Sequence, residues 1–213
     1  MRFFALALAL LCGCTRVYYA GLETLGVPKR DLLERRVEKA RDAQVDVKDQ
    51  FASALERFRA TVHVEGGDLE ARYDALSGEL QRCESRSSAL RERIDAVEDV
   101  AEALFSEWED ELEQYQRADL REASARQLAD TRARYHPMIA AMKRAHRRVE
   151  PVLASLRDIV LAMKHRLNAR ALGDVQGELA SVEREVDALV AAMNASIDQA
   201  TKFLDSDSDS PRS

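Results

Sequence analysis

The chain has 213 residues, of which a third are charged and 6% are aromatic, and it contains only 8 glycines and 4 prolines. So few helix-breaking residues, together with abundant alanine, glutamate, arginine and leucine, predict an all-α protein with long helices. The formal net charge of −6 argues against a nucleic-acid partner, because such partners select basic surfaces.

The N-terminus has the layout of a bacterial lipoprotein signal. Arg2 precedes an apolar run over residues 3–11, and Leu11-Cys12-Gly13-Cys14 follows. A run this short cannot cross a bilayer, which takes roughly 20 apolar residues, but it is typical of a signal peptide. We therefore expect residues 1–13 to be removed and Cys14 to become the lipid-bearing N-terminus. The alternative is an ordinary secretory signal that is cut elsewhere.

A lipid on Cys14 would hold the protein on a membrane of the bacterial cell envelope, facing the periplasm. Thr15, rather than an aspartate, follows the cysteine, which favours the outer over the inner membrane. Residues 14–27 would then be a lipidated tether. Cys83 remains as the only free thiol, so no intrachain disulfide framework is possible. Its spacing predicts a buried position on a helix face, with an intermolecular disulfide as the alternative.

Two helices are predicted in the first half of the domain, which spans residues 28–204. Each shows an apolar stripe at three- and four-residue steps. Pro28 suits the first turn of the first helix, and Gly66-Gly67 ends it. Its stripe runs from residue 33 to residue 62, and only Gln44 interrupts it. Asp68 is the expected N-cap of the second helix, whose coiled-coil-like stripe extends through Tyr115 to about residue 117.

The third predicted helix begins after Asp119, an expected N-cap with Glu122 as its capping-box partner. Pro137 and Pro151 fall inside this helix, and each removes a backbone hydrogen bond. Because the apolar stripe stays in phase across both prolines, we predict one kinked helix rather than two separate helices.

A break at residues 168–173 separates the third helix from the fourth, whose stripe extends to Leu204. Residues 205–213 contain no apolar side chain. A segment of this kind cannot bury enough apolar surface to offset the entropy cost of ordering, so we predict a disordered acidic tail.

Charge predicts how the helices fold back. Residues 95–113 contain nine acidic side chains and no basic one, whereas basic side chains predominate over residues 117–148. If the chain reverses near Arg117-Ala118, these stretches face each other, and the register is selected although each exposed pair contributes only about 0–1 kcal/mol. We predict a bundle of four long antiparallel helices, with residues 105–130 projecting as a two-helix coiled-coil hairpin. The first helix begins at the hairpin end, so the hairpin would face the anchored membrane.

The sequence offers no catalytic, cofactor or nucleotide site. It has no P-loop and no HExxH motif, and no histidine has a glutamate three residues before it. The acidic run could bind a metal ion, but a solvated face that pairs within the hairpin explains it better. The candidates for binding a protein partner lie on the hairpin, although the stripe position of Trp108 favours core packing over contact with a partner. They are Trp108, Glu109, Glu111 and Gln116.

Several segments together resemble the bacterial domain-of-unknown-function family numbered 2959. The resemblance implies a helical, signal-bearing envelope protein with no assigned activity, and it brings no catalytic residues. The segments are YYAG at 18–21, PKRDLLERRVEKARDAQ at 28–44, GGDLE at 66–70, RIDAVEDVAEALFSEWEDEL at 93–112, KHRLNARAL at 164–172 and ELASVE at 178–183.

These observations predict a membrane-anchored envelope lipoprotein that is not an enzyme. Its expected role is structural or adaptor-like, with the hairpin binding a protein partner or a second copy of the chain. The alternative is a periplasmic helical bundle that binds a ligand or a metal ion.

Overall fold

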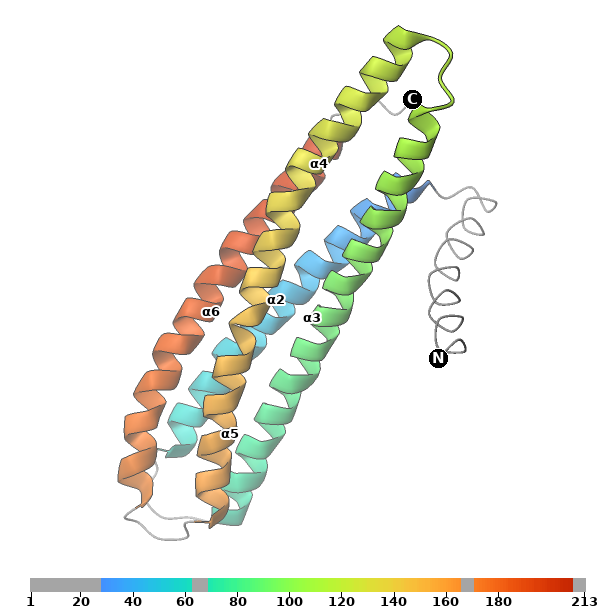
Figure 1. Cartoon of the computed structure of the whole chain (residues 1–213). Helices are drawn as coiled ribbons and strands as arrows, with labels where there is room; N and C mark the ends of the chain where they lie inside the picture. Colours follow the sequence, from blue (N-terminus) through green and yellow to red (C-terminus); the bar gives the residue numbers. More distant parts are fainter. Residues whose placement is uncertain (1–27, 63–68, 166–170, 209–213) are drawn as a thin grey trace, which may run out of the picture.

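The computed structural model describes residues 28–62, 69–165 and 171–208, so the signal, Cys14, the tether and Asp68 lie outside the described residues. Within these ranges the chain is helical, without strands (Figure 1). The helices are α2 (Lys29–Val62), α3 (Leu69–Leu112), α4 (Ala118–Arg147), α5 (Val149–His165) and α6 (Ala171–Ser208).

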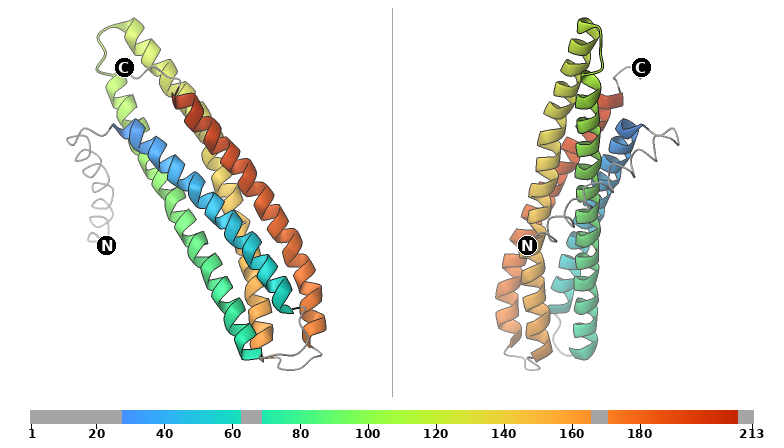
Figure 2. Two further views of the ribbon diagram at one scale, coloured as in Figure 1. Left: turned by 180° about the vertical axis from the view of Figure 1, so that it is seen from behind. Right: turned by 45° about the vertical axis from the view of Figure 1, so that its right-hand side comes forward.

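Four long helical columns pack side by side, because α5 continues in the direction of α4 and forms one column with it (Figures 1 and 2). α2 packs against α3 and α6, and the α4–α5 column packs against α3 and α6. Neighbouring columns run antiparallel, as expected for helices joined by short reversals. The predicted all-helical packing of four long helices is confirmed.

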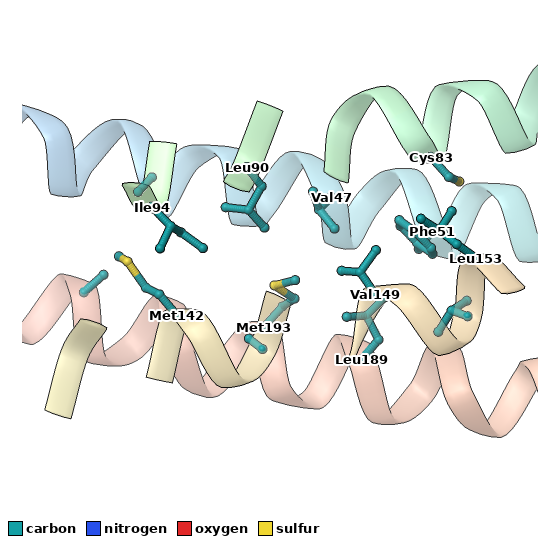
Figure 3. Close-up of a cluster of buried hydrophobic side chains, with 14 of the residues drawn as sticks. Val47, Phe51, Cys83, Leu90, Ile94, Met142, Val149, Leu153, Leu189 and Met193 are labelled. Carbon is teal, nitrogen blue, oxygen red and sulfur yellow. The ribbon is translucent and has the colours of Figure 1, made fainter. Parts of the chain in front are cut away.

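The apolar stripes meet along the axis of the bundle. Figure 3 shows Val47 and Phe51 of α2 facing Leu189 and Met193 of α6, with α3 and the α4–α5 column contributing to the same cluster. Each side chain that is fully removed from water in this way contributes about 1.5–3 kcal/mol. The stripe residues with no measurable exposure include Val37, Val47, Phe51, Phe58, Leu76, Leu90, Val97, Met138, Met142, Val182, Leu189 and Met193.

Gln44, which interrupts the first stripe, lies inside the core and is fully buried. Its Nε2 donates to the Ser196 hydroxyl oxygen on α6 at 2.7 Å, while its Oε1 has no hydrogen-bond partner among the described residues. A buried amide without its full set of partners costs stability, so this pair fixes how α2 sits against α6 at some energetic expense.

The connection between α3 and α4 differs from the prediction. α3 ends at Leu112, five residues early, and Tyr115 is 40% exposed rather than on the stripe. Asp119 is not the N-cap of α4: Arg117 occupies that position in an extended conformation, and Asp119 lies in the first turn. There its carboxylate is favoured by the helix dipole, and the hydrogen bond from Arg117 lowers its pKa. Glu122 therefore closes no capping box with Asp119.

The predicted single kinked helix is also wrong at its second proline. α4 runs through Pro137 without interruption but ends at Arg147, and α5 begins at Val149, two residues before Pro151. Pro151 cannot donate to the carbonyl of Arg147, and its ring crowds that carbonyl, so the preceding turn opens. The apolar stripe stays in phase across the break, with Ala145, Val149 and Val152 all buried.

The fourth predicted helix extends further at both ends than expected. α6 begins at Ala171, inside the predicted break, and continues to Ser208. Residues 205–208 of the predicted disordered tail are therefore helical, and residues 209–213 lie outside the described residues. Phe203 is buried near this end, and its packing provides the apolar support that residues 205–208 lack themselves.

The opposite charges predicted to face each other across the hairpin do so. Arg132 on α4 pairs with Glu109 on α3 at 2.6 Å, and Lys143 pairs with Glu98 at 2.7 Å. Further along, Arg157 on α5 reaches Glu84 at 2.8 Å. These side chains are partly or largely exposed, so the pairs select the register more than they stabilise the fold.

Cys83 is buried, as its spacing predicted, and burial raises the pKa of its thiol to about 12. In protein carrying Cys12→Ser and Cys14→Ser, we expect a maleimide to leave Cys83 unmodified under native conditions and to label it fully in denaturant. A Ser85→Cys variant in a Cys83→Ser background is the control, since residue 85 is exposed, and it should be labelled at once. Rapid native labelling of Cys83, or a disulfide dimer, would contradict this burial.

Candidate functional site

The hairpin of α3 and α4 extends beyond the other two columns at one end of the bundle (Figures 1 and 2). Lys29 Nζ at the start of α2 lies 2.7 Å from Glu107 Oε2 on α3, which marks where α2 begins to cover α3. Arg134 Nη1 on α4 donates to the carbonyl oxygen of Ser206 at 3.2 Å, which marks the end of α6. Residues 113–123, at the far end of the hairpin, are all exposed.

Trp108 lies at the base of this projection and connects three helices. Its indole Nε1 donates to the Ser124 hydroxyl oxygen on α4 at 2.8 Å. The guanidinium carbon of Arg30 on α2 lies 5.1 Å from the centroid of the indole ring, a cation–π geometry. The side chain is half-buried. These contacts favour the packing interpretation of Trp108 and leave only part of its ring accessible to a partner.

Glu109 and Glu111, the acidic candidates, lie on the same turn of α3 as Trp108. Arg132 Nη1 donates to Glu109 Oε1 at 2.6 Å, and this hydrogen bond lowers the pKa of the Glu109 carboxyl group. Glu111 is exposed and borders a shallow open pocket of about 270 Å³ at the start of α2. The pocket is lined by Pro28, Lys29, Arg30, Leu104, Glu107, Trp108 and Glu111.

Gln116 lies at the tip of the hairpin, in the exposed connection over residues 113–117. Two large apolar side chains flank it, since Tyr115 is 40% exposed and Leu120 is 45% exposed. Among the described residues, only Leu161 joins them as an exposed large apolar side chain. Leu120 was not among the residues expected at the surface, although its place in the first turn after the reversal was a usable signal.

The described residues bring together no group of three or more histidine, cysteine, aspartate or glutamate side chains suited to a metal ion. None of the helices in the described ranges combines the length and the hydropathy needed to cross a membrane. Cys14 lies outside these ranges, so the structure places Trp108, Glu109, Glu111 and Gln116 and leaves the predicted lipid site undescribed.

Comparison with protein families gives one result. The family described as "Protein of unknown function (DUF2959)" matches residues 18–206, from ten residues before Pro28 to two residues before the end of α6. The comparison with curated proteins found no match.

Trp108 should stabilise the junction of α2, α3 and α4. We expect Trp108→Ala to lower the free energy of unfolding by about 2 kcal/mol, less than for a fully buried tryptophan. Trp108→Phe should cost about 1 kcal/mol through the lost hydrogen bond to Ser124. Urea unfolding followed by circular dichroism measures both changes. Leu161→Ala is the control and should change stability by less than about 0.5 kcal/mol; equal stability of Trp108→Ala and this control would show that the indole does not brace the junction.

Proposed function

The chain belongs to the family described as "Protein of unknown function (DUF2959)", and from its N-terminal sequence and its geometry we propose that it is an envelope lipoprotein that acts as a protein-binding scaffold. Cys14 carries the lipid, the four-column bundle is the rigid body, and the projecting hairpin, a two-helix coiled coil, is the binding element. The protein has no enzymatic role in this proposal. It sits on the periplasmic face of the outer membrane.

The observation that carries the proposal is the projecting hairpin itself. An α-helical pair that extends past its neighbours contributes less to the core than the rest of the bundle does, yet this chain keeps eleven consecutive exposed residues there, 113–123. Tyr115 and Leu120 expose apolar surface at the tip. Tyrosine is one of the aromatic residues that are enriched in protein interfaces. The partner would meet Gln116, Tyr115 and Leu120 first and the acidic side of α3 next.

The place of the anchor supports a hairpin that faces the membrane. Pro28 lies at the same end of the bundle as the hairpin, because Lys29 contacts Glu107 near the end of α3. Thirteen residues separate Pro28 from Cys14, and an extended chain of that length spans at most roughly 50 Å. An attachment at this end favours an arrangement with the lipid and the hairpin tip on the same side, and in that arrangement the partner lies near the membrane surface.

Charge indicates the chemistry of the partner surface. The last turn of α3 and the connection after it carry Glu109, Asp110, Glu111 and Glu113, and Arg117 and Arg121 follow. The excess of negative charge favours a partner with basic residues around an apolar contact. A second copy of the chain meets this description less well, since its own hairpin repeats the same excess.

Site-specific photo-crosslinking in living cells tests the scaffold. A photoreactive residue in place of Gln116 should give one recurrent crosslinked envelope protein, identified by mass spectrometry. The same residue in place of Gln81, which is exposed nearer the opposite end of α3, is the control and should not capture that protein. If residue 116 crosslinks only to other copies of the chain, the protein is a self-assembling scaffold rather than an adaptor. Absence of any crosslink specific to Gln116 would contradict the proposal.

Shortening the hairpin separates binding from folding. Replacing residues 113–123 with a four-residue Gly-Ser turn removes only exposed side chains and keeps both Trp108 and Ser124. We expect the thermal unfolding midpoint to change by no more than about 2 °C, while capture of the partner is lost. Retained capture by the shortened protein would place the binding surface elsewhere.

The lipid anchor is tested at Cys14. Cys14→Ser should block maturation, abolish incorporation of a labelled fatty acid, and leave the precursor uncleaved, because the cysteine sulfur is the atom that takes up the lipid. Cys83→Ser is the matched control and should mature normally. Unchanged processing of Cys14→Ser would indicate an ordinary secretory signal instead.

A further inference from the structure

A second surface lies at the break between α4 and α5, away from the hairpin. There a shallow groove of about 200 Å³ lies between the α4–α5 column and α6, which pack against each other. The helix break itself helps to form it, because Pro151 lines one wall. Its lining residues are Arg148, Pro151, Ser181, Arg184, Glu185 and Ala188.

Two arginines from different columns line this groove without a carboxylate partner. Arg148 and Arg184 make no ion pair within the described residues, and neither does Arg144, one helical turn before Arg148. Arg157, two turns further along, pairs with both Glu84 and Glu150. The chain has more acidic than basic residues, so carboxylates were available for pairing. Two guanidinium groups without a paired carboxylate on one groove concentrate positive potential there.

The other groups in the groove are compatible with this potential. Glu185 contributes one carboxylate, and its Oε2 accepts a hydrogen bond from the Ser155 hydroxyl group at 2.9 Å. The groove therefore contains two guanidinium groups and one carboxylate, and that carboxylate already accepts a hydrogen bond. Ser181 adds a hydroxyl group to the lining.

We propose that this groove binds a small oxyanion, a phosphate or carboxylate group, between the guanidinium groups of Arg148 and Arg184. The planar guanidinium fork matches two oxygens of such a group and gives charge-assisted hydrogen bonds. The site is independent of the scaffold role, since Arg148 lies 30 residues along the α4–α5 column from Ala118, about 45 Å from the hairpin tip at 1.5 Å per residue.

Calorimetric titration of the purified full chain in a neutral detergent tests the site. Inorganic phosphate and citrate are the two probes, each at constant ionic strength, so that unspecific screening of charge contributes equally throughout. We expect one saturable binding event per chain with at least one of the two. Saturation with phosphate alone identifies a phosphate-bearing ligand class, and saturation with citrate alone identifies a carboxylate-bearing class.

The variants decide whether the groove is responsible. Arg148→Gln and Arg184→Gln should each weaken binding about tenfold, the effect of losing one charge-assisted hydrogen bond. Arg35→Gln is the matched control, because Arg35 on α2 is also exposed and also makes no ion pair within the described residues. Circular dichroism and thermal unfolding should be unchanged in all three. Absence of saturable binding to both probes, or equal weakening in Arg35→Gln, would overturn the proposal.

Discussion

The fold depends on the burial of four apolar stripes along one shared axis. Long helices of this composition have little reason to persist alone in water, because most helical stability in proteins comes from packing an apolar face. Each column here buries its stripe against two neighbours, and the stripes of α2, α3 and α6 are almost entirely apolar in the core. The order of the columns then follows from the short reversals between them, which force neighbours in sequence to be neighbours in space.

The hairpin is a consequence of unequal helix lengths under the same constraint. α3 has 44 residues, whereas α2 has 34, so the end of α3 and the start of α4 lose two of their packing neighbours. The sequence adapts to this loss. Leu128 and Thr131 of α4 are still buried near the base of the hairpin, and Trp108 and Arg30 pack against each other at the end of the core. The hairpin projects past the end of the core instead of ending level with it. This projection is the strongest structural argument for a binding role.

The sequence predicted the columns, the reversals and the paired charges, because period, glycine placement and charge sign are local properties of the chain. It did not predict the break before Pro151, since phase continuity of a stripe says nothing about whether one turn of backbone hydrogen bonds is lost. Asp119 was mistaken for an N-cap because the true boundary is set by where the extended backbone of Arg117 ends. The partners of Trp108, and the presence of Arg148 and Arg184 in the lining of one groove, depend on contacts between distant segments that no local pattern encodes.

Polar groups inside the bundle determine which of several possible packings is adopted. Apolar stripes alone would tolerate a slip of one helical turn, because leucine, valine and methionine substitute for one another at modest cost. Gln44 must instead lie opposite Ser196, or its buried Nε2 loses its hydrogen bond to the Ser196 hydroxyl group.

Glu79 acts in the same way between α2 and α3. It is buried, it accepts hydrogen bonds from Gln50 and Arg82, and Arg57 lies 2.7 Å away. A slip of α2 past α3 would remove the contacts from Gln50 and Arg57 and leave Arg82, on α3 itself, to pair with the buried carboxylate, and losing partners of a buried charge costs stability. The polar residues therefore fix the axial position of α2, and with it the height at which the hairpin emerges beside the tethered end of the chain.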